Sequence, residues 1–126
     1  MPRRFQSKFA TLLHLRYIDG RDWQLDSKLI YHSAIAGRIQ VPVGFITDFA
    51  SVPRVFWRVL PPDDYGPAAV VHDWAYRSHA LTRLVADQVY REALAVLEAP
   101  RWKQWVMYWG VRVGGSWAYH RDRAAF

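Results

Sequence analysis

The sequence contains no cysteine, and this absence excludes several kinds of chemistry at once. No disulfide framework is possible, and neither a thiolate metal site nor a cysteine nucleophile can be present. A chain without cysteine is compatible with a reducing compartment. Any metal site in this protein must therefore use oxygen and imidazole ligands.

The sequence also lacks the features of membrane-spanning and nucleic-acid-binding proteins. It has no run of about 18 consecutive apolar residues, so we expect no membrane span. The positive charges at residues 3–4 are not followed by a continuous apolar stretch, so we expect no signal peptide. Helix-turn-helix, zinc-finger and aromatic RNA-binding motifs are missing, so we do not expect nucleic acid as a partner.

The residues that are present indicate one globular domain. A length of 126 residues is typical of a single domain that buries a core without metals or disulfides, so we assign residues 1–126 to one domain. Hydrophobic residues make up 52% and charged residues 22%, which is a globular composition and not a disordered one. The net charge of +6 favours an anionic partner such as an envelope surface, although it also promotes solubility.

The first half of the chain shows the pattern of short strands. We expect three or four strands in one small antiparallel meander, from residues 12–18, 23–25, 29–34 and 38–43. The dipeptide Asp19-Gly20 between the first two strands is a hairpin signal. The sequence thus predicts a small antiparallel sheet in the N-terminal half.

The second half shows helical signals. We expect up to four helices, at residues 52–60, 67–79 and 82–98 and from residue 101 onward. Ser51 and Thr82 are the expected N-caps of the first and third of these helices. Gly110 and Gly114-Gly115 weaken the far end of the last one. The predicted fold class is therefore α+β, with three to four helices packed on the sheet.

The last expected helix has apolar residues on two sides. One stripe, which we expect to face the core, consists of Trp102, Trp105, Val106, Trp109 and Val113. The second stripe, which we expect to bind a partner protein, consists of Met107, Tyr108 and Val111. Shallow insertion of this helix into a membrane interface is the alternative.

Chemically active side chains gather at residues 72–76, where a base, a carboxylate and a phenol occupy about one helical turn. The helix is apolar on most sides, so His72 and Asp73 should be buried and need partners. The next helix should run antiparallel after a short turn, which places Asp87 opposite Asp73. With Asp48 from the preceding loop, these side chains would surround one pocket.

This cluster supports two chemical interpretations and one structural interpretation. In the first, Asp48, His72 and Asp73 bind a divalent cation, either Ca²⁺ or Mg²⁺, or Zn²⁺ if water completes the shell. In the second, His72 is a general base oriented by Asp87, and a metal on Asp73 polarises a carbonyl. In the third, the same side chains form a buried polar network that joins strands to helices through neighbouring arginines.

The pattern His-Asp-x-x-Tyr, with an aspartate from an antiparallel helix, resembles the active-site helices of secreted phospholipase A2. In that family the histidine is the base, the adjacent aspartate binds calcium, and the tyrosine and the distant aspartate support the histidine. The resemblance implies these roles for the corresponding residues here, which are His72, Asp73, Tyr76 and Asp87. The sequence departs from that family because it has no cysteine, no glycine-rich calcium loop before the helix, and a β-rich first half.

Three stretches together resemble a phage and prophage family, domain of unknown function 1353. They are residues 41–54, residues 72–76 and the pair Ala86-Asp87. The resemblance extends over residues 9–117 and implies a bacteriophage or prophage origin, without an established activity.

Two functions follow as expectations. The first is a virion-associated tail or baseplate component, present in the virion or in the host cytoplasm during assembly. It would contact other phage structural proteins through Met107, Tyr108 and Val111. The alternative is a metal-dependent hydrolase of host envelope lipid or peptidoglycan with His72 as general base. We favour the first, because the sequence shows no clear oxyanion-stabilising device or nucleophile.

Overall fold

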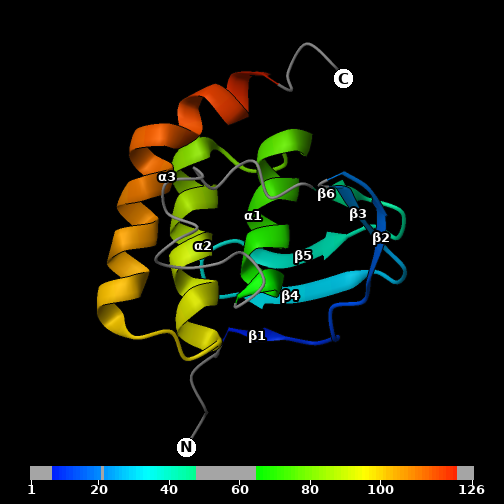
Figure 1. The fold of residues 1–126 in the computed structure, drawn as a ribbon. Coiled ribbons are helices and arrows are strands. Elements are labelled where there is room, and N and C mark those ends of the chain that lie inside the picture. Colours follow the sequence, from blue (N-terminus) through cyan, green and yellow to red (C-terminus); the bar gives the residue numbers. More distant parts are fainter. Residues whose placement is uncertain (1–6, 21, 48–64, 122–126) are drawn as a thin grey trace, which may run out of the picture.

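The computed structural model describes residues 7–20, 22–47 and 65–121, and in these residues all strands precede all helices. The elements are β1 (Lys8–Phe9), β2 (Leu15–Asp19), β3 (Asp22–Leu25), β4 (Leu29–Ser33), β5 (Gly37–Val41), β6 (Ile46–Thr47), α1 (Gly66–Ser78), α2 (Arg83–Val96) and α3 (Arg101–Arg121). Figure 1 shows α1 between α2 and the strands, with α3 on the far side of α2. The predicted α+β class is confirmed.

The strands form two three-stranded antiparallel sheets, whereas the sequence predicts a single meander. One sheet has the order β1-β4-β5 and the other has the order β2-β3-β6. Each sheet contains one edge strand of only two residues, which is β1 in the first sheet and β6 in the second. Such short segments carry no alternation of apolar and polar residues, so the sequence pattern gives no sign of them.

Two glycines allow the tight turns within these sheets. Gly20 follows β2 with φ of 56°, and Gly37 begins β5 with φ of 79°. Both values lie in the left-handed region, which glycine enters without the steric cost of a Cβ atom. The turn predicted at Asp19-Gly20 is therefore present between β2 and β3.

The helix boundaries follow local signals. Pro67 lies in the first turn of α1, where its missing N–H costs no hydrogen bond. Thr82 caps α2 as predicted, because its Oγ1 accepts a hydrogen bond from the backbone N–H of Val85 at 3.3 Å. The glycines in α3 do not end that helix, which continues to Arg121. The helix predicted at residues 52–60, with its Ser51 cap, lies outside the described residues.

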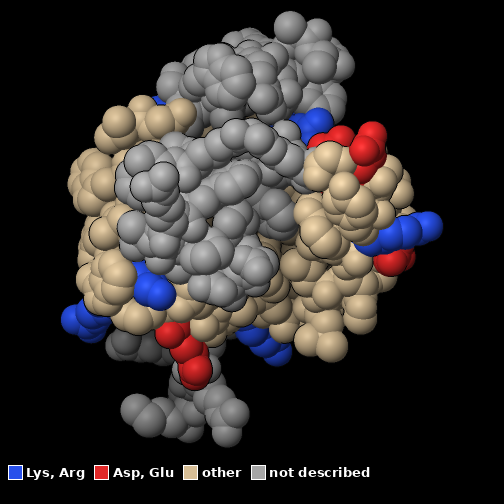
Figure 2. Space-filling model, in the orientation of Figure 1, with Lys and Arg blue, Asp and Glu red and all other residues tan. Residues whose placement is uncertain are grey.

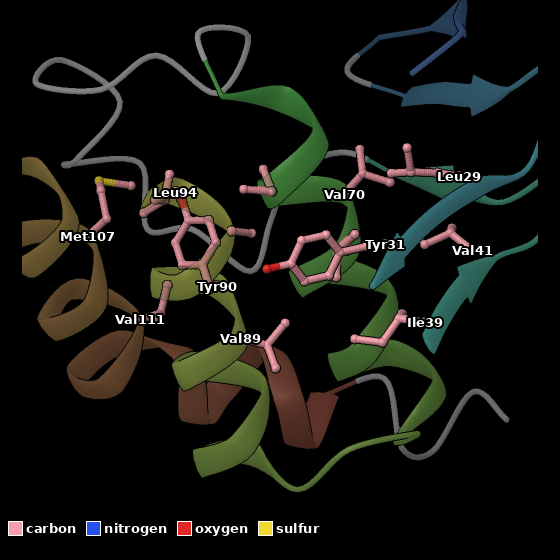
Figure 3. Packing of buried hydrophobic residues seen from close by; sticks show 14 of the residues in the cluster. Leu29, Tyr31, Ile39, Val41, Val70, Val89, Tyr90, Leu94, Met107 and Val111 are labelled. Carbon is pink, nitrogen blue, oxygen red and sulfur yellow. The ribbon is translucent and has the colours of Figure 1, made fainter. Parts of the chain in front are cut away.

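One core joins α1 to the strands and to the other helices. α1 is buried along most of its length, as its all-round apolar sequence predicts. Figure 3 shows side chains from β4, β5, α1, α2 and α3 meeting in this core. Tyr31 of β4 and Val70 of α1 are fully buried there. Within the described ranges, no helix combines the length and the apolar character that crossing a bilayer requires.

The predicted orientation of α3 is wrong, because this helix turns the opposite face to the core. The tryptophans expected inside are exposed, with exposed fractions of 57% for Trp102, 45% for Trp105 and 58% for Trp109. Met107 and Val111 are instead buried at 2% and 0%.

This burial also removes the predicted partner-binding face of Met107, Tyr108 and Val111, because two of its three residues lie in the core and Tyr108 is partly covered. The buried side of α3 also carries Gly110 and Gln104. A side lined by glycine and flexible methionine allows a close approach to α2, which a row of indole rings would prevent.

We expect Met107→Ala to lower the free energy of unfolding by about 2–5 kcal/mol, because it leaves a cavity in the core. Trp102→Ala, on the exposed side of the same helix, should change it by no more than about 0.5 kcal/mol. Urea unfolding of both variants measures the difference. A larger loss for Trp102→Ala than for Met107→Ala would contradict the observed orientation of α3.

Candidate functional site

The helices α1 and α2 bring together three of the predicted site residues. His72 and Tyr76 are four residues apart on α1, so both project from the same side of the helix. Asp87 lies on α2, which runs antiparallel to α1 after a short connection. His72 Nε2 is 2.8 Å from Asp87 Oδ1, and the Tyr76 hydroxyl donates a hydrogen bond to the same oxygen.

A third helix completes the surroundings of this carboxylate. Arg112 of α3 donates a hydrogen bond from Nη1 to Asp87 Oδ2 at 2.9 Å. The side chain of Asp87 is fully buried, and both of its oxygens are therefore satisfied. Nothing in the local sequence pattern around Arg112 indicates that this side chain reaches α2.

The surroundings of the cluster fix its protonation. Burial acts to raise the pKa of Asp87, but hydrogen bonds from His72, Tyr76 and Arg112 lower this pKa below its usual range. Burial lowers the pKa of His72, although Asp87 acts in the opposite direction. Burial and the neighbouring Asp87 raise the pKa of Tyr76. At neutral pH the cluster thus holds a carboxylate, a neutral imidazole and a neutral phenol.

This protonation pattern selects one tautomer of His72. A carboxylate accepts hydrogen bonds only, so Nε2 of the neutral ring must carry the proton that faces Asp87. Nδ1 is then the basic nitrogen. The imidazole also lies against two aromatic rings, with centroid distances of 4.2 Å to Tyr76 and 4.8 Å to Tyr90. Helical spacing predicts Tyr90 as a core residue but gives no sign of its contact with the imidazole.

Asp73 faces a different partner. Thr47 of β6 donates a hydrogen bond from Oγ1 to Asp73 Oδ2 at 2.6 Å, and both side chains are buried. Adjacent residues of a helix project about 100° apart, so Asp73 and His72 point in different directions. The structure therefore pairs Asp87 with His72 and Asp73 with Thr47, whereas the sequence places Asp87 opposite Asp73.

Two further arginines brace the same region through hydrogen bonds to backbone carbonyls. Arg77 Nη1 donates to the carbonyl oxygen of Ile46 and thereby ties α1 to β6. Arg83 Nη2 donates to the carbonyl oxygens of Val111 and Arg112 and ties α2 to α3. The polar network thus connects all three helices and one sheet.

The predicted metal site of Asp48, His72 and Asp73 stays a prediction, because Asp48 lies outside the described residues. Within the part of the chain that the structure describes, no group of three or more His, Asp or Glu side chains is placed to hold a metal ion. His72 and Asp73 are the two predicted ligands that the structure places.

The lowered pKa of His72 predicts how stability depends on pH. The unfolded chain takes up a proton on His72 near pH 6.5, and the folded protein does so only at lower pH. The unfolded state then binds more protons, so the free energy of unfolding should fall as the pH drops below about 6.5. In His72→Gln, which keeps an N–H donor near Asp87, this fall should be smaller.

Urea unfolding between pH 8 and pH 5 measures this dependence, because this pH range extends to both sides of the usual histidine pKa. His14→Gln is the matched control, because His14 is exposed and this variant should follow the unaltered protein. Equal pH dependence in His72→Gln and in the unaltered protein would contradict the assignment.

Comparison with known proteins identifies the family of this chain. The sequence profile described as "Protein of unknown function (DUF1353)" matches residues 23–111, which include α1 and α2. A relative, "Uncharacterized protein y4jT" of Sinorhizobium fredii (strain NBRC 101917 / NGR234), is 30% identical over 78 residues. The match covers 60% of this chain but only 23% of the relative, so the chain spans less than a quarter of that protein.

No solved structure matches the chain. The family match extends over well more than half of the 126 residues. The protein therefore belongs to the family of proteins of unknown function DUF1353.

Proposed function

We propose that the protein is a hydrolase in which His72 takes a proton from water and Asp87 orients the imidazole. The distance of 2.8 Å between His72 Nε2 and Asp87 Oδ1 is the observation that carries this proposal. A general base needs a fixed ring, a defined tautomer and a neutral state near the working pH. The buried carboxylate supplies the first two, and the lowered pKa of His72 supplies the third.

Tyr76 and Arg112 act as positioning residues in this proposal. They bind the two oxygens of Asp87 and hold the carboxylate in line with the imidazole. The resemblance to secreted phospholipase A2 implies the same arrangement of histidine, tyrosine and distant aspartate, which supports the proposal. Only 1% of His72 is exposed, so the proposal requires a conformational opening that admits water and substrate to the imidazole.

The proposed substrate is host envelope lipid or peptidoglycan. Both contain carbonyl groups that an activated water can attack. A divalent cation, Ca²⁺ or Zn²⁺, would polarise such a carbonyl when bound at Asp73. Asp73 follows His72 directly on α1, and one oxygen of its carboxylate accepts a hydrogen bond from Thr47, which holds the side chain in place.

The activity of His72→Gln tests the hydrolase. We measure fatty-acid release from phosphatidylglycerol vesicles and soluble fragments from purified peptidoglycan, each with Ca²⁺ or Zn²⁺. His72→Gln should slow hydrolysis at least about 100-fold, because it removes the base. Its melting temperature should stay close to that of the unaltered protein, since an amide can replace the N–H donor to Asp87.

His14→Gln is the control and should retain full activity. The hydrolase is refuted if the unaltered protein releases nothing from either substrate, or if His72→Gln hydrolyses at the full rate.

We propose, as a second candidate, a virion component of a tail or baseplate. The observation in its favour is the apolar surface of the β2-β3-β6 sheet. Its exposed residues are Tyr17, Ile18, Trp23 and Ile46, with exposed fractions from 36% to 54%. Tyr17 and Trp23 are paired across β2 and β3 with ring centroids 5.3 Å apart, and exposed apolar rings of this kind favour a subunit contact. The resemblance to a phage and prophage family supports this candidate, and tail proteins can also carry an enzyme.

Mass spectrometry of purified phage particles tests the second candidate. We expect peptides of this chain in particles from a strain that carries the gene, at a constant ratio to the other tail subunits. An abundant host cytoplasmic protein serves as the control for carry-over. Absence of the chain from washed particles would refute a virion role.

A further inference from the structure

We propose that the outer face of α3 binds the surface of an anionic lipid bilayer, with its indole rings at the level of the lipid head groups. The inference uses residues of α2 and α3 that have no part in the proposed chemistry at His72. It can therefore be tested without any hydrolytic activity.

The face is a row of exposed indoles. Trp102, Trp105 and Trp109 are spaced by three and four residues, so they project from the same side of α3. All three are about half exposed, and Val113, on the same side, is 83% exposed. An indole joins a large apolar body to one N–H donor, a combination that favours the boundary between hydrocarbon and water.

Cations lie at the border of this row. Lys103 Nζ is 5.5 Å from the ring centroid of Trp102. The guanidinium of Arg91, on α2, is 4.4 Å from the ring centroid of Trp105. Residues 101–114 of α3 include Arg101, Lys103 and Arg112 and no acidic residue. Figure 2 shows basic side chains at the lower left, near the start of α3 in Figure 1.

Not every cation of this region is available to a partner. Arg112 is bound to Asp87 and is excluded from the proposed contact. Arg91 instead borders an open hollow of about 530 Å³ between α2 and α3, which Trp105 and Tyr108 also line. Glu92 is the acidic residue of this hollow, and one of its oxygens accepts a hydrogen bond from Tyr31 at 2.6 Å. The carboxylate of Glu92 disfavours an anion inside the hollow, so the guanidinium of Arg91 would meet a lipid phosphate group at the rim.

Charge decides between a bilayer and a second copy of the chain. In a two-fold dimer through this face, the same patch would meet itself, so a surface that carries Arg101, Lys103 and Arg91 would oppose a second positive surface. Like charges opposed in this way disfavour association. An anionic bilayer offers both complements, because its phosphates attract the cations and its acyl boundary covers the indoles.

Sedimentation with lipid vesicles tests the inference. The protein should bind vesicles of phosphatidylglycerol more tightly than vesicles of phosphatidylcholine, and binding should weaken as salt is raised. The double variant Trp102→Ala/Trp109→Ala should bind at least about tenfold more weakly, because it removes two large apolar side chains from the contact. Arg91→Gln should reduce the preference for the anionic lipid.

Further controls exclude misfolding and lipid hydrolysis as causes of a change in vesicle binding. Trp23→Ala removes a partly exposed tryptophan from the β2-β3-β6 sheet and should leave binding unchanged. Binding is also measured without added divalent cation, so that the hydrolysis proposed at His72 does not contribute. Circular dichroism confirms that each variant is folded before its binding is compared.

Three results would overturn the inference. The first is no binding to phosphatidylglycerol vesicles. The second is equal binding by the unaltered protein and by Trp102→Ala/Trp109→Ala. The third is a dimer in solution, detected by light scattering, that the same double variant dissociates, because the face would then bind a second copy.

Discussion

The arrangement of the three helices depends on the contacts that the buried carboxylate of Asp87 makes. This carboxylate is reached from α1 by His72 and Tyr76 and from α3 by Arg112. A buried charge is tolerated only when partners replace the water that it loses, and removal of one partner of a buried pair typically costs about 3–5 kcal/mol. One side chain of α2 thereby fixes the positions of both neighbouring helices.

The same network explains why a structural brace and a general base make such similar demands on these residues. A brace needs every polar atom satisfied, and the two oxygens of Asp87 have partners from two helices. A general base needs a neutral imidazole held by a carboxylate, and His72 meets this condition because burial lowers its pKa. The two roles differ in whether water must reach His72, because a general base needs this access and a structural brace does not.

The orientation of α3 has consequences at both of its faces. The helix brings Met107 and Val111 into the core and at the same time delivers Arg112 to Asp87. Trp102, Trp105 and Trp109 are consequently left on the outside. Apolar periodicity identifies two candidate faces in this helix but cannot rank them, because burial depends on the shape of the neighbouring helix as much as on side-chain hydrophobicity.

The sequence by itself determined the features that depend on neighbours within a few residues. These include the Thr82 cap, the left-handed glycine at the β2-β3 turn and the antiparallel course of α1 and α2. The antiparallel course in turn brought Asp87 to the level of the His72 helix turn, so the site could be located before its contacts were known. Such signals act through backbone geometry that a short stretch of chain sets alone.

Only the tertiary structure decided which groups meet across long separations in the chain. It paired Asp87 with His72 and Asp73 with Thr47, brought Arg112 to the carboxylate, split the strands into two sheets and chose the inner face of α3. Each of these outcomes depends on how two surfaces fit and on which polar atoms must be satisfied when both are buried. That information is shared between distant segments, so no single stretch of the sequence contains it.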